Sequence, residues 1–188
     1  MHAPSVPVSK LGRAAHDVGM AGLLGGNLFA RLALHPSVTE IRDESERGKV
    51  INTAWRRYGT INSLSLAAIG AGWVGARAAE SANSRLSPTE RKLAYAKDAL
   101  VGAVAVTGIA SAVQGMRFAK QAPGGAVPLT DGDHAAPSAT DQQRNAKRRL
   151  NVLGAASLLA EVGLVSVNAA LAQENFRRPP ARRFFKRV

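Results

Sequence analysis

The chain has 188 residues, no cysteine and a formal charge of +12. The absence of cysteine excludes disulfides and thiolate metal sites, and the positive charge favours anionic partners such as lipid headgroups or nucleic acid. Aromatic residues make up only 5% of the chain while alanine is abundant, which argues against a strand-rich fold. An all-α fold in a single domain is therefore predicted.

Four weakly apolar segments are separated by charged or turn-rich stretches. They cover about residues 18–34, 58–79, 99–118 and 151–172. Each segment is close to the roughly 20 residues that cross a hydrocarbon core, and none has the wide charged face of a typical soluble helix. The pattern predicts a four-helix transmembrane bundle. A mean hydropathy of only −0.07 leaves a soluble helical bundle as the alternative.

Two stretches between the segments have their own signals. Ser87 can cap the third helix, with Pro88 in its first turn and Glu90 three residues after the cap. Between the third and fourth segments, residues 121–145 are rich in Pro, Gly and Asp, and they include "DGDH", which lacks the rest of a calcium loop. This stretch is predicted to be a flexible, largely disordered loop.

The fourth segment, "NVLGAASLLAEVGLVSVNAALA", contains one charged residue, Glu161, at its midpoint. A carboxyl group at that depth should be protonated, paired or turned toward a polar cavity. Asn62, Gln114 and His16 are its candidate partners, and Asn168 is a further candidate buried polar residue. Glu161 thus suggests either an ion- or proton-coupled transporter or a holin-like pore, or simply a hydrogen bond between helices.

Small residues recur at helical spacing in three of the segments. The set comprises Gly19, Gly22 and Gly26 in the first, Gly72 in the second and Gly154 in the fourth. Small residues at this spacing allow helix backbones to approach closely in lipid. We expect these faces either to pack within one bundle or to join the chain to a second copy or to a membrane partner.

Basic and aromatic residues outside the apolar segments favour contact with anionic lipid headgroups. One group lies before the second segment and comprises Trp55, Arg56 and Arg57. The other is the basic tail 177–188, which includes Arg182, Arg183, Lys186 and Arg187. The density of charge in the tail predicts that both termini are cytoplasmic. No nucleic-acid module is visible, which disfavours nucleic acid as the partner.

Residues 70–75 read "GAGWVG", which matches the G-x-G-x-x-G of a dinucleotide-binding turn. The fingerprint also needs an acidic residue at the end of a second strand, and the segment that follows ends without one. A soluble dinucleotide-binding protein remains a further alternative. We favour Gly70, Gly72 and Gly75 as close-packing positions within a helix.

No catalytic set or metal-ligand spacing can be recognised, so neither an enzyme nor a cofactor is predicted. The stretches "GGNLFARLALHPSV" and "INTAWRRYG", within residues 18–60, resemble uncharacterised bacterial four-span integral membrane proteins. The resemblance implies a bacterial inner-membrane protein and transfers no catalytic residue. The sequence therefore predicts a membrane protein of structural or interaction type.

Overall fold

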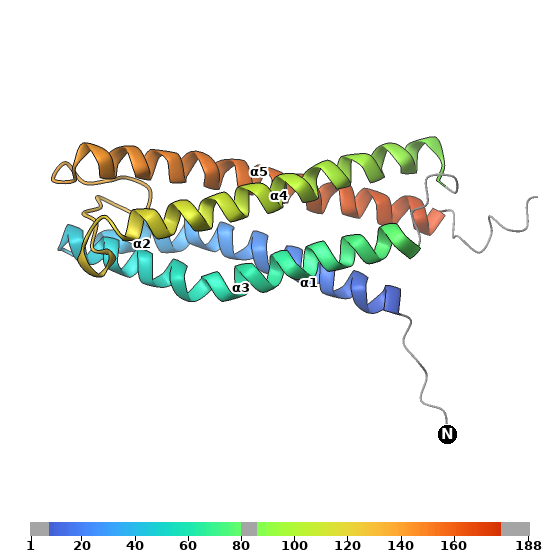
Figure 1. Ribbon diagram of the computed structural model, residues 1–188, viewed down its shortest axis with the longest axis horizontal. Helices are drawn as coiled ribbons and strands as arrows, with labels where there is room; N and C mark the ends of the chain where they lie inside the picture. The colour runs from blue at the N-terminus through green and yellow to red at the C-terminus, as the bar shows by residue number, and fades with distance from the viewer. Residues whose placement is uncertain (1–7, 80–85, 178–188) are drawn as a thin grey trace, which may run out of the picture.

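A computed structural model describes residues 8–79 and 86–177 as a helical bundle, with no strand in those ranges. The four long helices of this part of the chain lie along one axis (Figure 1). They are α1 (Val8–Phe29), α3 (Glu44–Ala79), α4 (Pro88–Ala119) and α5 (Asp141–Arg177). The all-α prediction is confirmed for this part of the chain.

The helical pitch changes after α1, just before Pro36. A π-helical turn (η1, Ala30–Leu34) follows α1, and the N–H of His35 bonds to the carbonyl of Ala30, five residues earlier. Pro36 comes next and lacks the N–H that a regular helix requires. The wider turn accommodates the proline ring and redirects the chain through two short turns, α2 (His35–Ser37) and η2 (Val38–Glu40).

The helices extend well beyond the predicted apolar segments. α3 has 36 residues and α5 has 37, which correspond to about 54 Å and 55 Å at 1.5 Å per residue. The basic and aromatic residues predicted to contact headgroups before the second segment lie on the same continuous helix as that segment, α3. The spacing of apolar residues does not predict such polar extensions. Backbone hydrogen bonds hold these turns in a helix, and those bonds leave no apolar pattern in the sequence.

The bundle consists of two closely packed pairs, α1 with α3 and α4 with α5. α1 begins and α5 ends at the same end of the bundle, where α3 also ends (Figure 1). The α1–α3 connection and the long α4–α5 connection lie together at the opposite end. The described chain therefore runs along the bundle an even number of times.

Side-chain caps define where the helices begin. The Ser87 hydroxyl accepts from the Glu90 N–H at 3.2 Å, and the Glu90 carboxylate accepts from the Ser87 N–H at 2.8 Å. This confirms the predicted capping box of α4. An equivalent reciprocal pair, Thr140 and Gln143, starts α5 and was not predicted.

The α4–α5 connection contradicts the prediction of a disordered loop. Residues 120–140, which we call the cap, fold over the end of the bundle and include the 3₁₀ turn η4 (Pro123–Gly125). Val127 and Leu129 are 0% exposed. Gly48 of α3 has no side chain where the Val127 carbonyl approaches, so a Cβ there would clash with it. The predicted flexible segment 121–145 also extends too far, because residues 141–145 belong to α5.

Apolar side chains face outward along the middle of the bundle. Large apolar residues are exposed on every long helix, for example Val18 (71%), Leu64 (67%), Val106 (69%) and Leu159 (74%). Two helices, α4 and α5, are long and apolar enough to cross a membrane, and little of their apolar windows is buried inside the bundle. Those two candidate spans are the part of the four-span prediction that the structure itself supports.

Candidate functional site

Glu161 is buried in the middle of the bundle and is held by residues from two helices. Asn27 of α1 donates its amide N–H to Oε1 at 2.6 Å, and Ser157 donates its hydroxyl to the same oxygen at 2.8 Å. Oε2 is buried without a hydrogen-bond partner. One oxygen of the carboxyl group thus anchors the side chain, while the other has unused hydrogen-bonding capacity.

The surroundings of Glu161 are apolar. It adjoins an interior cluster of buried residues that includes Met20, Leu23, Val104 and Leu164. A carboxyl group packed in this way lacks the several oxygen ligands that a metal cation requires. Among the described residues, no group of three or more His, Asp or Glu could hold a metal ion. The arrangement suits the binding of a single proton or a hydrogen bond to one donor.

The predicted partners of Glu161 are wrong. Asn62 keeps its side-chain oxygen buried and unbonded, and both ring nitrogens of His16 are also without a partner. Gln114 lies on the outer surface of α4, beside arginines of α5. The true partner, Asn27, is the only amide in the uncharged stretch 18–30. That isolation was the signal that could have identified it.

Asn168 belongs to a separate polar cluster, toward the end where α1 begins. Its side-chain oxygen accepts from Lys97 at 2.5 Å, and its N–H₂ donates to Asp17 at 3.1 Å. The amide therefore bridges opposite charges on α1 and α4. Nearby, Asp98 accepts from Trp73 at 2.7 Å and pairs with Arg77. Of the four predicted buried polar residues, Glu161 is buried, whereas Asn62, Gln114 and Asn168 are half-buried, and the four do not form one site.

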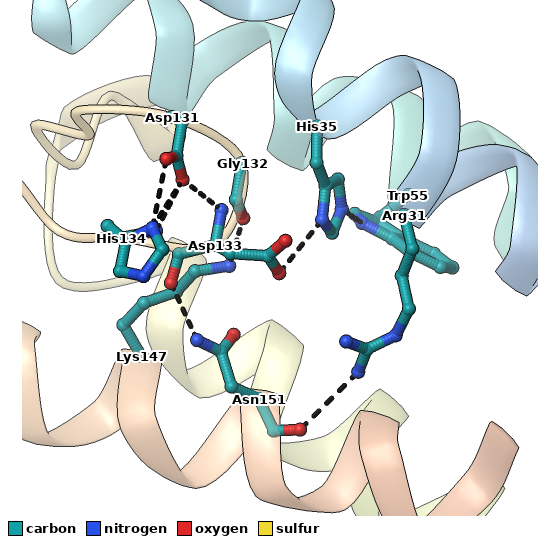
Figure 2. A network of polar contacts seen from close by, with 9 residues as sticks. All are labelled: Arg31, His35, Trp55, Asp131, Gly132, Asp133, His134, Lys147 and Asn151. Carbon is teal, nitrogen blue, oxygen red and sulfur yellow. Dashed lines mark hydrogen bonds and ion pairs between the residues drawn. The ribbon is translucent and has the colours of Figure 1, made fainter. Parts of the chain in front are cut away.

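A third polar network joins the cap to three helices (Figure 2). His35 Nδ1 lies 3.0 Å from Asp133 of the cap, and its Nε2 lies 3.3 Å from the indole nitrogen of Trp55. An indole N–H can only donate, so Nε2 must accept. Nδ1 then carries the hydrogen and donates to Asp133. Both ring nitrogens of His35 are thereby occupied, which leaves neither free to act as a base.

The neutral form of His35 is favoured by its position. Burial lowers the pKa of His35 below its ordinary value of 6.5, and the charges of Lys147 and Arg31 act in the same direction. Asp133 opposes this shift without reversing it. Protonation would place a hydrogen on Nε2 where Trp55 already donates one. The Trp55–His35 bond therefore depends on neutral histidine.

The "DGDH" stretch at 131–134 forms a compact turn that supports this network. Asp131 Oδ1 accepts from the N–H groups of Asp133 and His134, both at 2.7 Å. Burial would raise the pKa of Asp131, but the hydrogen bonds from the His134 side chain and these N–H groups outweigh it and lower the pKa. Lys147 of α5 donates to the Gly132 carbonyl. The stretch therefore has a structural role in the cap.

The π-helical turn η1 and helix α5 are also connected beneath the cap. Asn151 donates to the Asp133 carbonyl at 2.6 Å, and its own carbonyl accepts from Arg31 at 3.4 Å. A Cβ on Gly154 would lie 2.9 Å from the Arg31 guanidinium. Gly154 thus provides room for an arginine, whereas the sequence suggested room for a helix backbone.

The remaining predicted packing glycines lie where α1 meets α3. A Cβ on Gly19 would lie 2.8 Å from the Ser65 carbonyl, and one on Gly22 would lie 2.8 Å from the Ser65 hydroxyl. Gly26 leaves room for the Tyr58 ring, and Gly72 leaves room for the Gly12 carbonyl and the His16 side chain. These glycines contact another helix of the same chain. Their faces are therefore occupied within the bundle and are not open to a second copy.

The predicted headgroup residues occupy different environments. Arg56 and Arg57 are exposed on α3. Trp55 instead turns inward, where it packs against the apolar cluster beneath the cap and bonds to His35. The tail residues Arg182, Arg183, Lys186 and Arg187 lie outside the described residues.

The dinucleotide-binding interpretation of "GAGWVG" is wrong in its geometry. Residues 70–75 lie within the continuous helix α3, with neither the strand nor the turn that the motif requires. Only Gly72 has the expected close neighbour, since a Cβ on Gly70 or Gly75 would meet nothing within 4 Å. The match is therefore a feature of a glycine-rich helix.

Comparison with protein-family models, curated proteins and solved structures finds no match to this chain.

Proposed function

We propose that this chain is a small integral membrane protein of structural or interaction type, whose four long helices all cross the bacterial inner membrane. The observation that carries the proposal is the apolar outer face of the bundle. In an aqueous protein, exposed apolar residues are interspersed with charges. Here residues 58–76 and 99–116 contain no charge, and 150–173 contain only Glu161, which is buried.

α1 and α3 are less apolar than α4 and α5. In this proposal they depend on contacts with those two helices to remain in the membrane. The uncharged stretch of α1, residues 18–30, corresponds to only about 20 Å of helix, less than a hydrocarbon core of ~30 Å. The charges at its ends are held by α5, because Asp17 bonds to Asn168 and Arg31 bonds to the Asn151 carbonyl. Satisfying these groups internally lowers their cost near lipid.

The role in the membrane would depend on contact with other proteins or lipids. Because α3 occupies the glycine face of α1, self-association or binding of a membrane partner would use the outward apolar faces. The basic tail favours an orientation with both termini in the cytoplasm, in contact with anionic headgroups. That orientation places the cap on the opposite side of the membrane.

Membrane fractionation of the full chain tests this proposal. We expect the protein to remain in the pellet after an alkaline carbonate wash and to be released by detergent. Release by carbonate alone would contradict the proposal and would leave a peripheral or soluble bundle. Cysteine introduced at Ser138 of the cap, in a chain that has no other cysteine, would report the orientation through a membrane-impermeant thiol reagent.

A second candidate function is proton-coupled transport through Glu161. It is favoured by Oε2, which is buried without a partner between helices. The packed apolar interior suits transfer of a proton better than passage of a hydrated ion. Glu161→Gln removes the titratable group while preserving its size.

Proton flux into proteoliposomes, followed with a pH-sensitive dye, measures this activity. We expect Glu161→Gln to abolish the flux. Glu46→Gln is the matched control, since it makes the same change at an exposed position. Equal flux in the wild type and Glu161→Gln would remove the transport hypothesis without affecting the membrane proposal.

A further inference from the structure

A groove of about 430 Å³ opens on the outer surface between α4 and α5, near the cap. The two helices pack against each other and cross near the middle of the bundle, and they lie further apart toward that end in Figure 1. The groove is lined by Gln114 of α4 and by Arg148, Arg149, Val152 and Leu153 of α5. Its composition is two-sided, with guanidinium groups at one edge and apolar side chains along the rest.

The two arginines have no role in holding the fold together. Both are exposed, and no hydrogen bond or ion pair joins either guanidinium to another of the described residues. Other basic residues at this end do have such roles, since Arg47, Arg144 and Lys147 all donate to carbonyls of the chain. The charges of Arg148 and Arg149 are therefore available to an external anion.

In the proposed arrangement, the groove lies at the level of the membrane where headgroups meet acyl chains. Arg148 and Arg149 immediately precede the predicted span 151–172, at the level of the headgroups. Val152, which is 70% exposed, and Leu153 lie one turn further along α5, at the level where acyl chains begin. A ligand that fits this order has an anionic group at one end, joined through a short polar linker to a hydrocarbon chain.

We infer that this groove is a binding site for one anionic phospholipid. Its phosphate is bound by Arg148 and Arg149, its glycerol region lies beside the Gln114 amide, and an acyl chain covers Val152 and Leu153. Guanidinium groups bind phosphate oxygens through paired hydrogen bonds, which gives the site a preference that a diffuse positive surface lacks. This inference rests on membrane insertion, and it assigns a particular lipid contact within the proposed arrangement.

Native mass spectrometry of the full chain in detergent micelles tests the site, with phosphatidylglycerol or phosphatidylcholine added. We expect the wild type to bind phosphatidylglycerol more tightly. Each arginine near an anionic group contributes about fivefold, so Arg148→Gln/Arg149→Gln should reduce binding roughly 30-fold. Arg91→Gln/Lys92→Gln removes the same charge from exposed positions at the opposite end of α4 and should retain most of the binding.

A third variant tests the apolar half of the site. Val152→Trp fills the groove without changing the charge, and we expect it to weaken phosphatidylglycerol binding at an unchanged helix content. Inorganic phosphate at the same concentration should not displace the lipid. Displacement by phosphate, an equal loss in Arg148→Gln/Arg149→Gln and Arg91→Gln/Lys92→Gln, or no preference for phosphatidylglycerol in the wild type would each overturn the inference. Retention in the carbonate pellet would still support the proposed function in those cases.

Discussion

The cap and the middle of the bundle have opposite distributions of polarity. In the cap, Val127 and Leu129 are completely buried and polar groups such as Thr130 and Ser138 are exposed. In the middle, Leu159 is 74% exposed while Glu161 is 3% exposed. A single chain thus has an apolar interior at one end and an apolar exterior along its centre.

In the proposed membrane arrangement, this difference reflects two solvents, water around the cap and lipid around the middle. Burial of apolar groups drives folding in water, so a cap in water encloses its valine and leucine side chains. Lipid gives no such driving force, and hydrogen bonds and close packing then hold helices together. The bonds among Asn27, Ser157 and Glu161, and the glycine contacts between α1 and α3, are of that kind.

The largest effect is expected from a charge on the outer face of the middle. Leu159→Arg should cost about 2.5–3.5 kcal/mol if this position faces lipid, because arginine is poorly tolerated near a span centre. The same change on a surface in water should fall within about ±0.5 kcal/mol. The fraction of protein retained in the carbonate-washed membrane is the measurement. Gln142→Arg, at an exposed position in the first turn of α5, is the control and should be silent.

A close approach in the cap gives the next effect. Gly48→Ala places a Cβ against the Val127 carbonyl and should destabilise the protein by about 1–3 kcal/mol. Gly59→Ala lies in the same helix with nothing within 4 Å, and it should stabilise the helix by about 0.5–1 kcal/mol. Unfolding curves of the two variants, recorded in detergent, compare their free energies of unfolding directly. Equal changes in the free energy of unfolding would show that the Val127 carbonyl does not approach Gly48 closely.

A smaller effect is expected at the buried carboxyl group. Asn27→Ala removes one of the two hydrogen bonds to Glu161 Oε1 and should cost about 0.6–1.7 kcal/mol, the range for such bonds between membrane helices. The double variant Asn27→Ala/Glu161→Leu removes both partners and should recover part of the stability. Unfolding in mixed micelles measures both. Additive losses would mean that the two side chains do not interact.

The smallest effect is a response of the cap to acid. Because burial lowers the pKa of His35, the unfolded chain binds this proton more readily than the folded one. The contribution to stability is full above pH 6.5 and is lost as the pH falls through the window below it. In a Trp73→Phe background, Trp55 fluorescence should change over that window. His35→Ala should remove the transition, whereas a persistent transition would assign it to another group.

Several features could be predicted from local sequence. The all-α fold follows from composition, and the capping box at Ser87 follows from residues three positions apart. The burial of Glu161 follows from an isolated charge in an apolar helix. Each of these depends on neighbours along the chain, whose relative geometry a helix determines. The partner of Glu161 could not be predicted, because Asn27 is 134 positions away and the helix pairing alone brings the two together.

By itself, the sequence determined the helices, their apolar stretches and the isolation of one carboxyl group, since these depend on backbone propensity and on periodicity. Only the tertiary structure decided that residues 120–140 form an ordered cap, that Trp55 faces His35, and that the glycines of α1 contact α3. Composition suggested disorder for the cap because glycine and proline disfavour helices. Contacts with Gly48 and with apolar residues of α3, α4 and α5 provide the burial that composition cannot predict.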